Sequence, residues 1–137
     1  MKTELQRKLM ENYPKLFGLM GDTSKGPKMP MTLFGIECDN GWYNLLDSLF
    51  YFLEYENTHG SEDSPIELTQ VKEKFGTLRV YYLGGRLESS AVDDMINLAE
   101  RLSAVTCEEC GAPGEIDHTA GWLRCRCKAH EKASWEA

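Results

Sequence analysis

The segment from residue 106 to residue 130 reads TCEECGAPGEIDHTAGWLRCRCKAH. Cys107 and Cys110 form a C-x2-C pair, and after sixteen intervening residues Cys127 and His130 form a C-x2-H pair. Two such pairs are the usual ligand set of a closed, tetrahedral structural zinc site. The glycines after the first pair let the chain turn back, so that backbone amides approach the sulfurs. The sequence therefore predicts a structural Zn2+ ion bound by these four residues.

Two further residues leave the ligand set open. Cys125 lies two residues before Cys127, and His118 lies between the two pairs. A C-x-C pair is tighter than the spacing that fits one turn of chain, so Cys127 with His130 is the preferred second pair. A catalytic zinc ion needs an open fourth position and a nearby base, and four candidate ligands argue against one. The order of His118 and Glu115 also differs from the zinc deaminase signature.

Composition indicates one globular domain, or one domain with a small metal module. The chain has 137 residues, 42% of them hydrophobic, and a mean hydropathy of -0.44. It has no apolar run long enough to cross a membrane, and its N-terminal residues contain no apolar signal core. We therefore expect a cytoplasmic protein, in which reduced thiols favour metal binding over disulfides.

Hydrophobic spacing predicts helices around a small sheet. Helices are expected at residues 3–13 with Thr3 as N-cap, at 42–56 after a cap at Asp39 or Asn40, and at 90–105 with a capping box of Ser90 and Asp93. The middle helix is the most apolar and should be central to the core. Residues 21–32 and 57–65 are predicted to be loops, and 33–38 a short extended segment.

Residues 66–83 predict a β-hairpin whose turn lies near Phe75 and Gly76. After the last long helix, a short hairpin with Ile116 and Trp122 should connect the two ligand pairs. The predicted fold is α+β: helices packed on a small antiparallel sheet, followed by a treble-clef-like zinc module. Residues 1–30 would form an N-terminal helix and loop, 31–105 the core, and 106–137 the zinc module, as one compact unit.

Charge is distributed unevenly within the net charge of -7. Residues 31–70 hold eight Asp and Glu residues and no Lys or Arg. A region without cations disfavours docking on nucleic acid. It is either a solvated acidic face or a surface that engages a basic partner.

A second set of residues combines carboxylates, cations and aromatic rings near the strands. These side chains either form solvated or paired charges that hold the hairpin, or a polar surface that binds a partner or a ligand. An enzyme using the charged members as acid and base is a weaker alternative. The candidate surface consists of Glu37, Asp39, Trp42, Lys72, Lys74, Arg79 and Tyr81.

Two other features carry weaker predictions. Cys38 stands alone and is expected to be a small buried hydrophobic residue rather than a nucleophile. Arg124, Arg126 and Lys128 lie close to the last ligands and could touch phosphates, although acidic residues occur in the same segment.

Three blocks of sequence are distinctive in combination. They are FGIECDNGWYNLL at residues 34–46, QVKEKFGTLRVYY at 70–82, and the tail with TCEECGAPG and GWLRCRCKAH. Together they resemble a family of small uncharacterised proteins of bacteriophages and prophages, over about residues 31–130. The family's tail ends in C-x2-H, which matches Cys127 and His130. Its position matching Cys125 is usually not a cysteine, so the resemblance implies that Cys125 is not a ligand.

The resemblance brings no activity with it, and only its context points to a role. Phage accessory proteins of this size often inhibit or modulate host machinery, which is an analogy of context. We expect a non-enzymatic protein that binds a host or phage protein, with a host-defence or nuclease component as the favoured kind of target. The alternative is a zinc-dependent regulator that binds nucleic acid. The sequence names no substrate and no oligomeric state.

Overall fold

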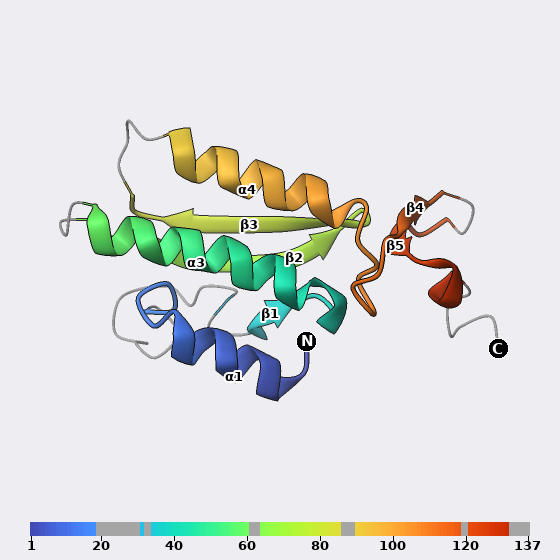
Figure 1. Cartoon of the computed structure of the whole chain (residues 1–137), viewed down its shortest axis with the longest axis horizontal. Helices are drawn as coiled ribbons and strands as arrows, with labels where there is room; N and C mark the ends of the chain where they lie inside the picture. Colours follow the sequence, from blue (N-terminus) through green and yellow to red (C-terminus); the bar gives the residue numbers. More distant parts are fainter. Residues whose placement is uncertain (19–30, 32–33, 61–63, 86–89, 119–120, 132–137) are drawn as a thin grey trace.

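A computed structural model describes residues 1–18, 31, 34–60, 64–85, 90–118 and 121–131. Two long helices lie on one side of a three-stranded sheet, a shorter helix lies near the sheet's first strand, and a small two-stranded sheet forms the C-terminal end (Figure 1). The elements are α1 (Thr3–Asn12), β1 (Ile36–Glu37), η1 (Asn40–Trp42), α3 (Tyr43–His59), β2 (Glu67–Lys74), β3 (Thr77–Leu83), α4 (Ser90–Ser103), β4 (Glu115–Asp117), β5 (Arg124–Arg126) and η2 (Lys128–His130). The α+β prediction is confirmed.

The larger sheet is mixed rather than purely antiparallel. Strands β2 and β3 pair antiparallel as predicted, but β1 adds to β2 in parallel, with Ile36 opposite Val71. The prediction of an antiparallel sheet was therefore wrong for β1. Two residues of strand carry too short a pattern to reveal the direction of pairing, and their partner lies far along the chain.

The β2–β3 turn lies where the sequence placed it. Phe75 and Gly76 form a two-residue connection, with φ angles of 56° and 86°. Positive φ at both central positions is the requirement of the type I′ turn that suits a twisted hairpin. Gly76 adopts this conformation without strain, and its N–H is bonded to the Glu73 carboxylate at 2.8 Å.

One face of the sheet packs under the helices. Leu68, Val71, Leu78 and Val80 are buried there. A register shift between Leu68 and Gln70 keeps Leu68 and Val71 on the same face although they are three residues apart. Helix α4 covers β3, and it contacts α3 beside it. This layering forms the main core of the protein.

The outer edge of β3 is held by α4. The Ser103 hydroxyl accepts a hydrogen bond from the N–H of Leu78 at 2.8 Å, and Glu100 lies 3.8 Å from the Arg79 guanidinium. An edge strand with unpaired backbone groups is an open template for another strand. These two contacts close part of that edge.

Helix α3 extends three residues beyond the predicted end, to His59. Asn57, predicted to lie in a loop, is buried in the last turn of this helix. Its side chain donates to the carbonyl of Ile66 at 3.0 Å and accepts from the N–H of Ile66 at 2.7 Å. A polar side chain at this position is stable because both of its polar ends are satisfied.

The predicted helix caps are wrong where they can be checked. The cap of α1 is Lys2 rather than Thr3, with no side-chain bond. A 3-10 turn, η1, precedes α3, and its cap Asp39 makes no side-chain capping bond. The side chain of Ser90 and most of the predicted loop at 21–32 lie outside the described residues. Asp93, the other member of the predicted capping box, accepts a hydrogen bond from the Tyr82 hydroxyl. Within the described ranges, no helix is long and apolar enough to cross a membrane.

Candidate metal centre

The four predicted ligands come together. Cys107, Cys110, Cys127 and His130 place one ligand atom each within 4.8 Å of the others, so they could hold a metal ion. Cys110 Sγ lies 3.6 Å from Cys127 Sγ, and His130 Nδ1 lies 3.2 Å from Cys127 Sγ and 3.8 Å from Cys107 Sγ. The first pair comes from the turn after α4. In the second pair, Cys127 caps η2 and His130 is its last residue, after the β4–β5 hairpin.

The first pair is formed by a tight turn of chain. Gly111 has a φ of 82°, and its N–H bonds to the Cys107 carbonyl at 2.8 Å. Burial acts to raise the pKa of Cys107, but hydrogen bonds from the backbone N–H groups of Cys127, Cys110 and Glu109 outweigh it and lower that pKa to about 7. A thiolate is the form that binds metal, so these amides prepare the sulfur as a ligand.

The imidazole of His130 has a carboxylate beside the nitrogen that faces away from the sulfurs. His130 Nδ1 faces the sulfurs, while Nε2 lies 3.7 Å from the Glu109 carboxylate. A carboxylate beside the distal nitrogen of a metal-binding imidazole fixes the ring and its tautomer. The hydrogen bond with His130 lowers the pKa of Cys127.

Neither alternative ligand belongs to the cluster. Cys125 is fully buried and forms part of the hydrophobic core, and burial raises its pKa to about 11. His118 is exposed, directly after β4. Cys125 sits opposite Ile116 in the β4–β5 hairpin, and both side chains pack against the hydrophobic core.

The metal module, residues 107–131, and the segment that leads into it are attached to the core through hydrogen bonds from η1. The N–H of Gly41 bonds to the Glu108 carbonyl at 2.7 Å, and the indole N–H of Trp42 bonds to the Thr106 carbonyl at 2.9 Å. A Cβ added at Gly41 would lie 2.2 Å from the carbonyl oxygen of Cys107. Only glycine allows this approach.

A carboxylate between the first two ligands adds a polar link. Glu108 is 7% exposed, and its carboxylate accepts the N–H of Asp39 at 2.9 Å. Arg126, whose side chain is 11% exposed, lies 3.4 Å from Glu108, 3.7 Å from Asp39 and 3.7 Å from Glu109. Burial raises the pKa of Glu108, although the Asp39 N–H acts in the opposite direction. No local pattern predicts this network, because its members come from three separate segments of the chain.

The predicted surface residues divide into separate groups. Glu37, Lys72 and Arg79 occupy one row across β1, β2 and β3, on the sheet face opposite the core. Tyr81, 46% exposed, follows on the same face, while Lys74 lies over the ring of Phe75 at the hairpin tip. The row could bind a polar group, but the charges do not converge as a set of acid and base.

Two predictions about single residues have different outcomes. Trp42 is fully buried and bonded to Thr106, so its place in a binding surface was wrong. Aromatic residues often anchor protein interfaces, but Trp42 is the first of a series of apolar residues, continued by Leu46 and Leu49, that pack in the core. Cys38 is buried as predicted, and burial raises its pKa, which keeps the thiol neutral and unreactive.

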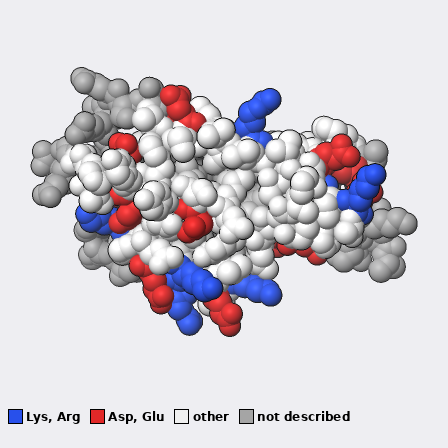
Figure 2. All heavy atoms as spheres, viewed as in Figure 1, with Lys and Arg blue, Asp and Glu red and all other residues white. Residues whose placement is uncertain are grey.

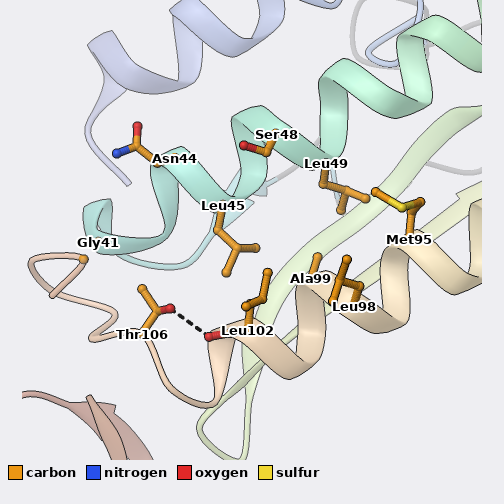
Figure 3. A pocket seen from close by; sticks show the side chains of 11 residues that line it. Gly41, Asn44, Leu45, Ser48, Leu49, Met95, Leu98, Ala99, Leu102 and Thr106 are labelled. Atoms are coloured by element: carbon orange, nitrogen blue, oxygen red, sulfur yellow. Dashed lines mark hydrogen bonds between the residues drawn. The ribbon is translucent and has the colours of Figure 1, made fainter. Parts of the chain in front are cut away.

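A groove that the sequence did not indicate lies between α3 and α4 (Figure 3). Its volume is about 330 Å³, and side chains of the two helices face one another across it. One end is closed by Thr106 and Gly111 of the segment that leads into the metal centre. The lining residues are Gly41, Asn44, Leu45, Ser48, Leu49, Met95, Leu98, Ala99, Leu102, Thr106 and Gly111.

Comparisons with protein-family models, with curated proteins and with solved structures found no match.

Proposed function

We propose that this protein is a zinc-stabilised module that binds another protein and has no catalytic activity of its own. The observation that carries the proposal is the apolar groove between α3 and α4. Leu98, Leu102 and Val105 beside it are 49%, 46% and 56% exposed. Contiguous exposed apolar side chains on a soluble protein indicate an interaction site.

Aromatic side chains extend this surface along α3. Tyr51 and Tyr55 are 68% and 51% exposed on the helix that forms one wall of the groove. Figure 2 shows the helix side of the molecule, where a broad area without charged groups lies between the acidic and basic side chains. Tyrosine and leucine around a groove supply the rigid apolar contacts that dominate protein interfaces.

Zinc is the metal that fits the ligand atoms best. A tetrahedral Zn2+ with bonds of about 2.3 Å to sulfur and about 2.0 Å to nitrogen places two sulfurs about 3.8 Å apart and sulfur about 3.5 Å from nitrogen. The separations of 3.6 Å between the sulfurs of Cys110 and Cys127, and of 3.2 and 3.8 Å from sulfur to His130 Nδ1, agree with these values. A turn with two ligands, a hairpin, and a final turn with two more is also consistent with a treble-clef-like module.

The ligand set supports a structural role for the ion. Three sulfurs and one imidazole complete a tetrahedron and leave no position for water or substrate. With the charged residues of the sheet spread along a row rather than gathered in a pocket, binding accounts for the structure better than catalysis does.

The alternative, a regulator that binds nucleic acid, receives less support. Arg126, one of the cations expected to touch phosphates, is 11% exposed and lies close to three carboxylates. A guanidinium in that position has little charge to offer to a backbone phosphate. Replacing Arg124 and Lys128 with glutamate would test the alternative, which requires affinity for DNA or RNA to fall and to decrease steeply with salt.

The resemblance to phage proteins suggests where a target should be sought, namely among bacterial host proteins such as defence or nuclease components. The test is affinity capture from bacterial lysate with three forms of the protein. They are the wild type, the double variant Leu98→Ser and Leu102→Ser, and the control Tyr81→Ser on the opposite side of the sheet. Circular dichroism and metal content first establish that all three are folded.

The expected result is a protein enriched by the wild type and by Tyr81→Ser but not by the double variant. The proposal fails if the same proteins are recovered with all three forms, or if none exceeds the background.

A further inference from the structure

The walls of the α3–α4 groove restrict what can bind there. Both walls are α-helices, whose backbone N–H and C=O groups are satisfied within the helix. The nearby edge of β3 is partly closed by Ser103, which bonds to Leu78. An extended peptide needs free backbone groups to pair with, whereas a helix satisfies its own. The groove therefore favours a helical occupant.

The two helices that form the groove are strongly acidic. Between them α3 and α4 carry six carboxylates, three on each, and one arginine, Arg101. None of the six is among the residues that line the groove, but helical spacing places two of them beyond its end away from the metal centre. Glu56 follows Phe52 by one helical turn on the groove side of α3, and the exposed Asp94 precedes Leu98 by one turn on α4. An apolar groove with two carboxylates beyond one end matches a helix that has an apolar stripe and cations toward one of its ends.

The same charges argue against a second copy of this chain as the occupant. Each copy has a net charge of -7, so two copies of the chain repel one another as they approach. Like charges across an interface oppose association. The occupant is therefore a different protein with the opposite charge.

We infer that the groove binds an amphipathic helix of a partner protein whose polar face is basic, an inference that rests on the proposed protein-binding function. The groove with its acidic end runs from Gly41 to Glu56, a helix length of about 22 Å, so the bound helix would be about four turns long. Its apolar stripe would lie on Leu45, Leu98 and Leu102. Its cations would lie over Glu56 and Asp94.

The probe is a fluorescein-labelled 15-residue peptide of leucine and lysine with leucines at helical spacing. Two control peptides are used: one with glutamate in place of lysine, and one with the leucine–lysine composition in an order without helical periodicity. Fluorescence anisotropy at physiological salt measures binding to the zinc-loaded full chain. We expect the basic helical peptide to bind at least about tenfold more tightly than either control.

Variants locate the binding. The double variant Leu98→Ser and Leu102→Ser should weaken binding about tenfold, whereas Tyr81→Ser should leave it unchanged. Replacing Asp94 and Glu56 with lysine should weaken binding of the basic peptide several-fold. The same replacement should strengthen binding of the acidic control peptide, because it removes the repulsion between like charges.

The inference is overturned if the three peptides bind equally, or if the double variant binds like the wild type. It is also overturned if sedimentation shows a dimer that the double variant converts to monomers. If a captured host protein depends on Leu98 and Leu102 while the peptides show no preference for charge, the protein-binding function stands and the basic helix is wrong.

Discussion

The α+β core and the metal module differ in how much apolar side chain they bury. In the core, large side chains such as Trp42, Phe50 and Leu68 are fully buried between helices and sheet. In the described part of the metal module, the fully buried side chains are the small Cys107 and Cys125. Burial of apolar area contributes about 25 cal/mol per Å², so two cysteines stabilise the module far less than the core residues stabilise the core. The difference teaches that one chain can combine a region stabilised by packing with a region that buries little apolar surface of its own.

Removing the metal should produce the largest difference between the two regions. Structural zinc ions in small modules contribute on the order of 10 kcal/mol to folding, so loss of the ion should unfold residues 107–131. We expect Cys107→Ser, or treatment with EDTA, to abolish amide protection there in hydrogen exchange. Protection in β2 and β3 should largely remain. Unchanged protection of the module in metal-free protein would show that packing, not the ion, maintains it.

Phe50→Ala should destabilise the core and leave the metal centre unaffected. The Phe50 ring is fully buried and makes edge-on contacts with Tyr13 and Phe17, at centroid distances of 6.1 and 5.6 Å. We expect the free energy of unfolding in urea to fall by about 3–5 kcal/mol. Metal content should stay at one ion per chain. The neighbouring control Tyr51→Ala, at a position that is 68% exposed, should change stability by less than about 0.5 kcal/mol.

Gly41→Ala tests the contact between the two regions. The added Cβ would overlap the Cys107 carbonyl, at 2.2 Å, and must displace the first ligand pair or η1. We expect a loss of about 1–3 kcal/mol of stability and weaker metal binding in competition with a chelator. The control is Gly121→Ala, where the Cβ meets no atom within 4 Å and only the φ of 66° opposes the change. Equal effects of the two substitutions would mean that the regions are not coupled at η1.

Cys125→Ala should have the smallest effect. This sulfur lies outside the ligand cluster, so the variant should retain one metal ion per chain and lose only about 1 kcal/mol through lost packing. Elemental mass spectrometry measures the metal directly, and Cys127→Ala is the matched variant that should lose it. Loss of metal from the Cys125 variant would instead place Cys125 among the ligands.

Short-range patterns in the sequence were sufficient to predict the metal-ligand cluster and the hairpin turn. The spacing of Cys107, Cys110, Cys127 and His130 predicted the ligand cluster, because each pair is placed by one local turn. Phe75 and Gly76 predicted the hairpin turn for a similar reason. The alternation of Leu78 and Val80 with polar residues is also a short-range pattern, and it matches the buried face of β3.

Features that depend on distant segments were not predictable in the same way. The parallel pairing of β1 with β2 joins residues 35 positions apart, Ile36 and Val71, and no local pattern encodes it. Gly41 resembles an ordinary turn residue until Cys107 is seen against it. The α3–α4 groove likewise exists only after two separate helices pack side by side.

Asn57 has a consequence for how freely the chain could be modified. Its amide binds both backbone groups of Ile66, so the end of α3 and the start of β2 are fastened together at that point. The connection between them therefore has fixed ends. Each doubling of the length of such a connection raises the free energy of closing it by only about 0.6 kcal/mol. A peptide tag or fluorescent reporter inserted after Gly60 should therefore leave both the metal centre and the groove intact.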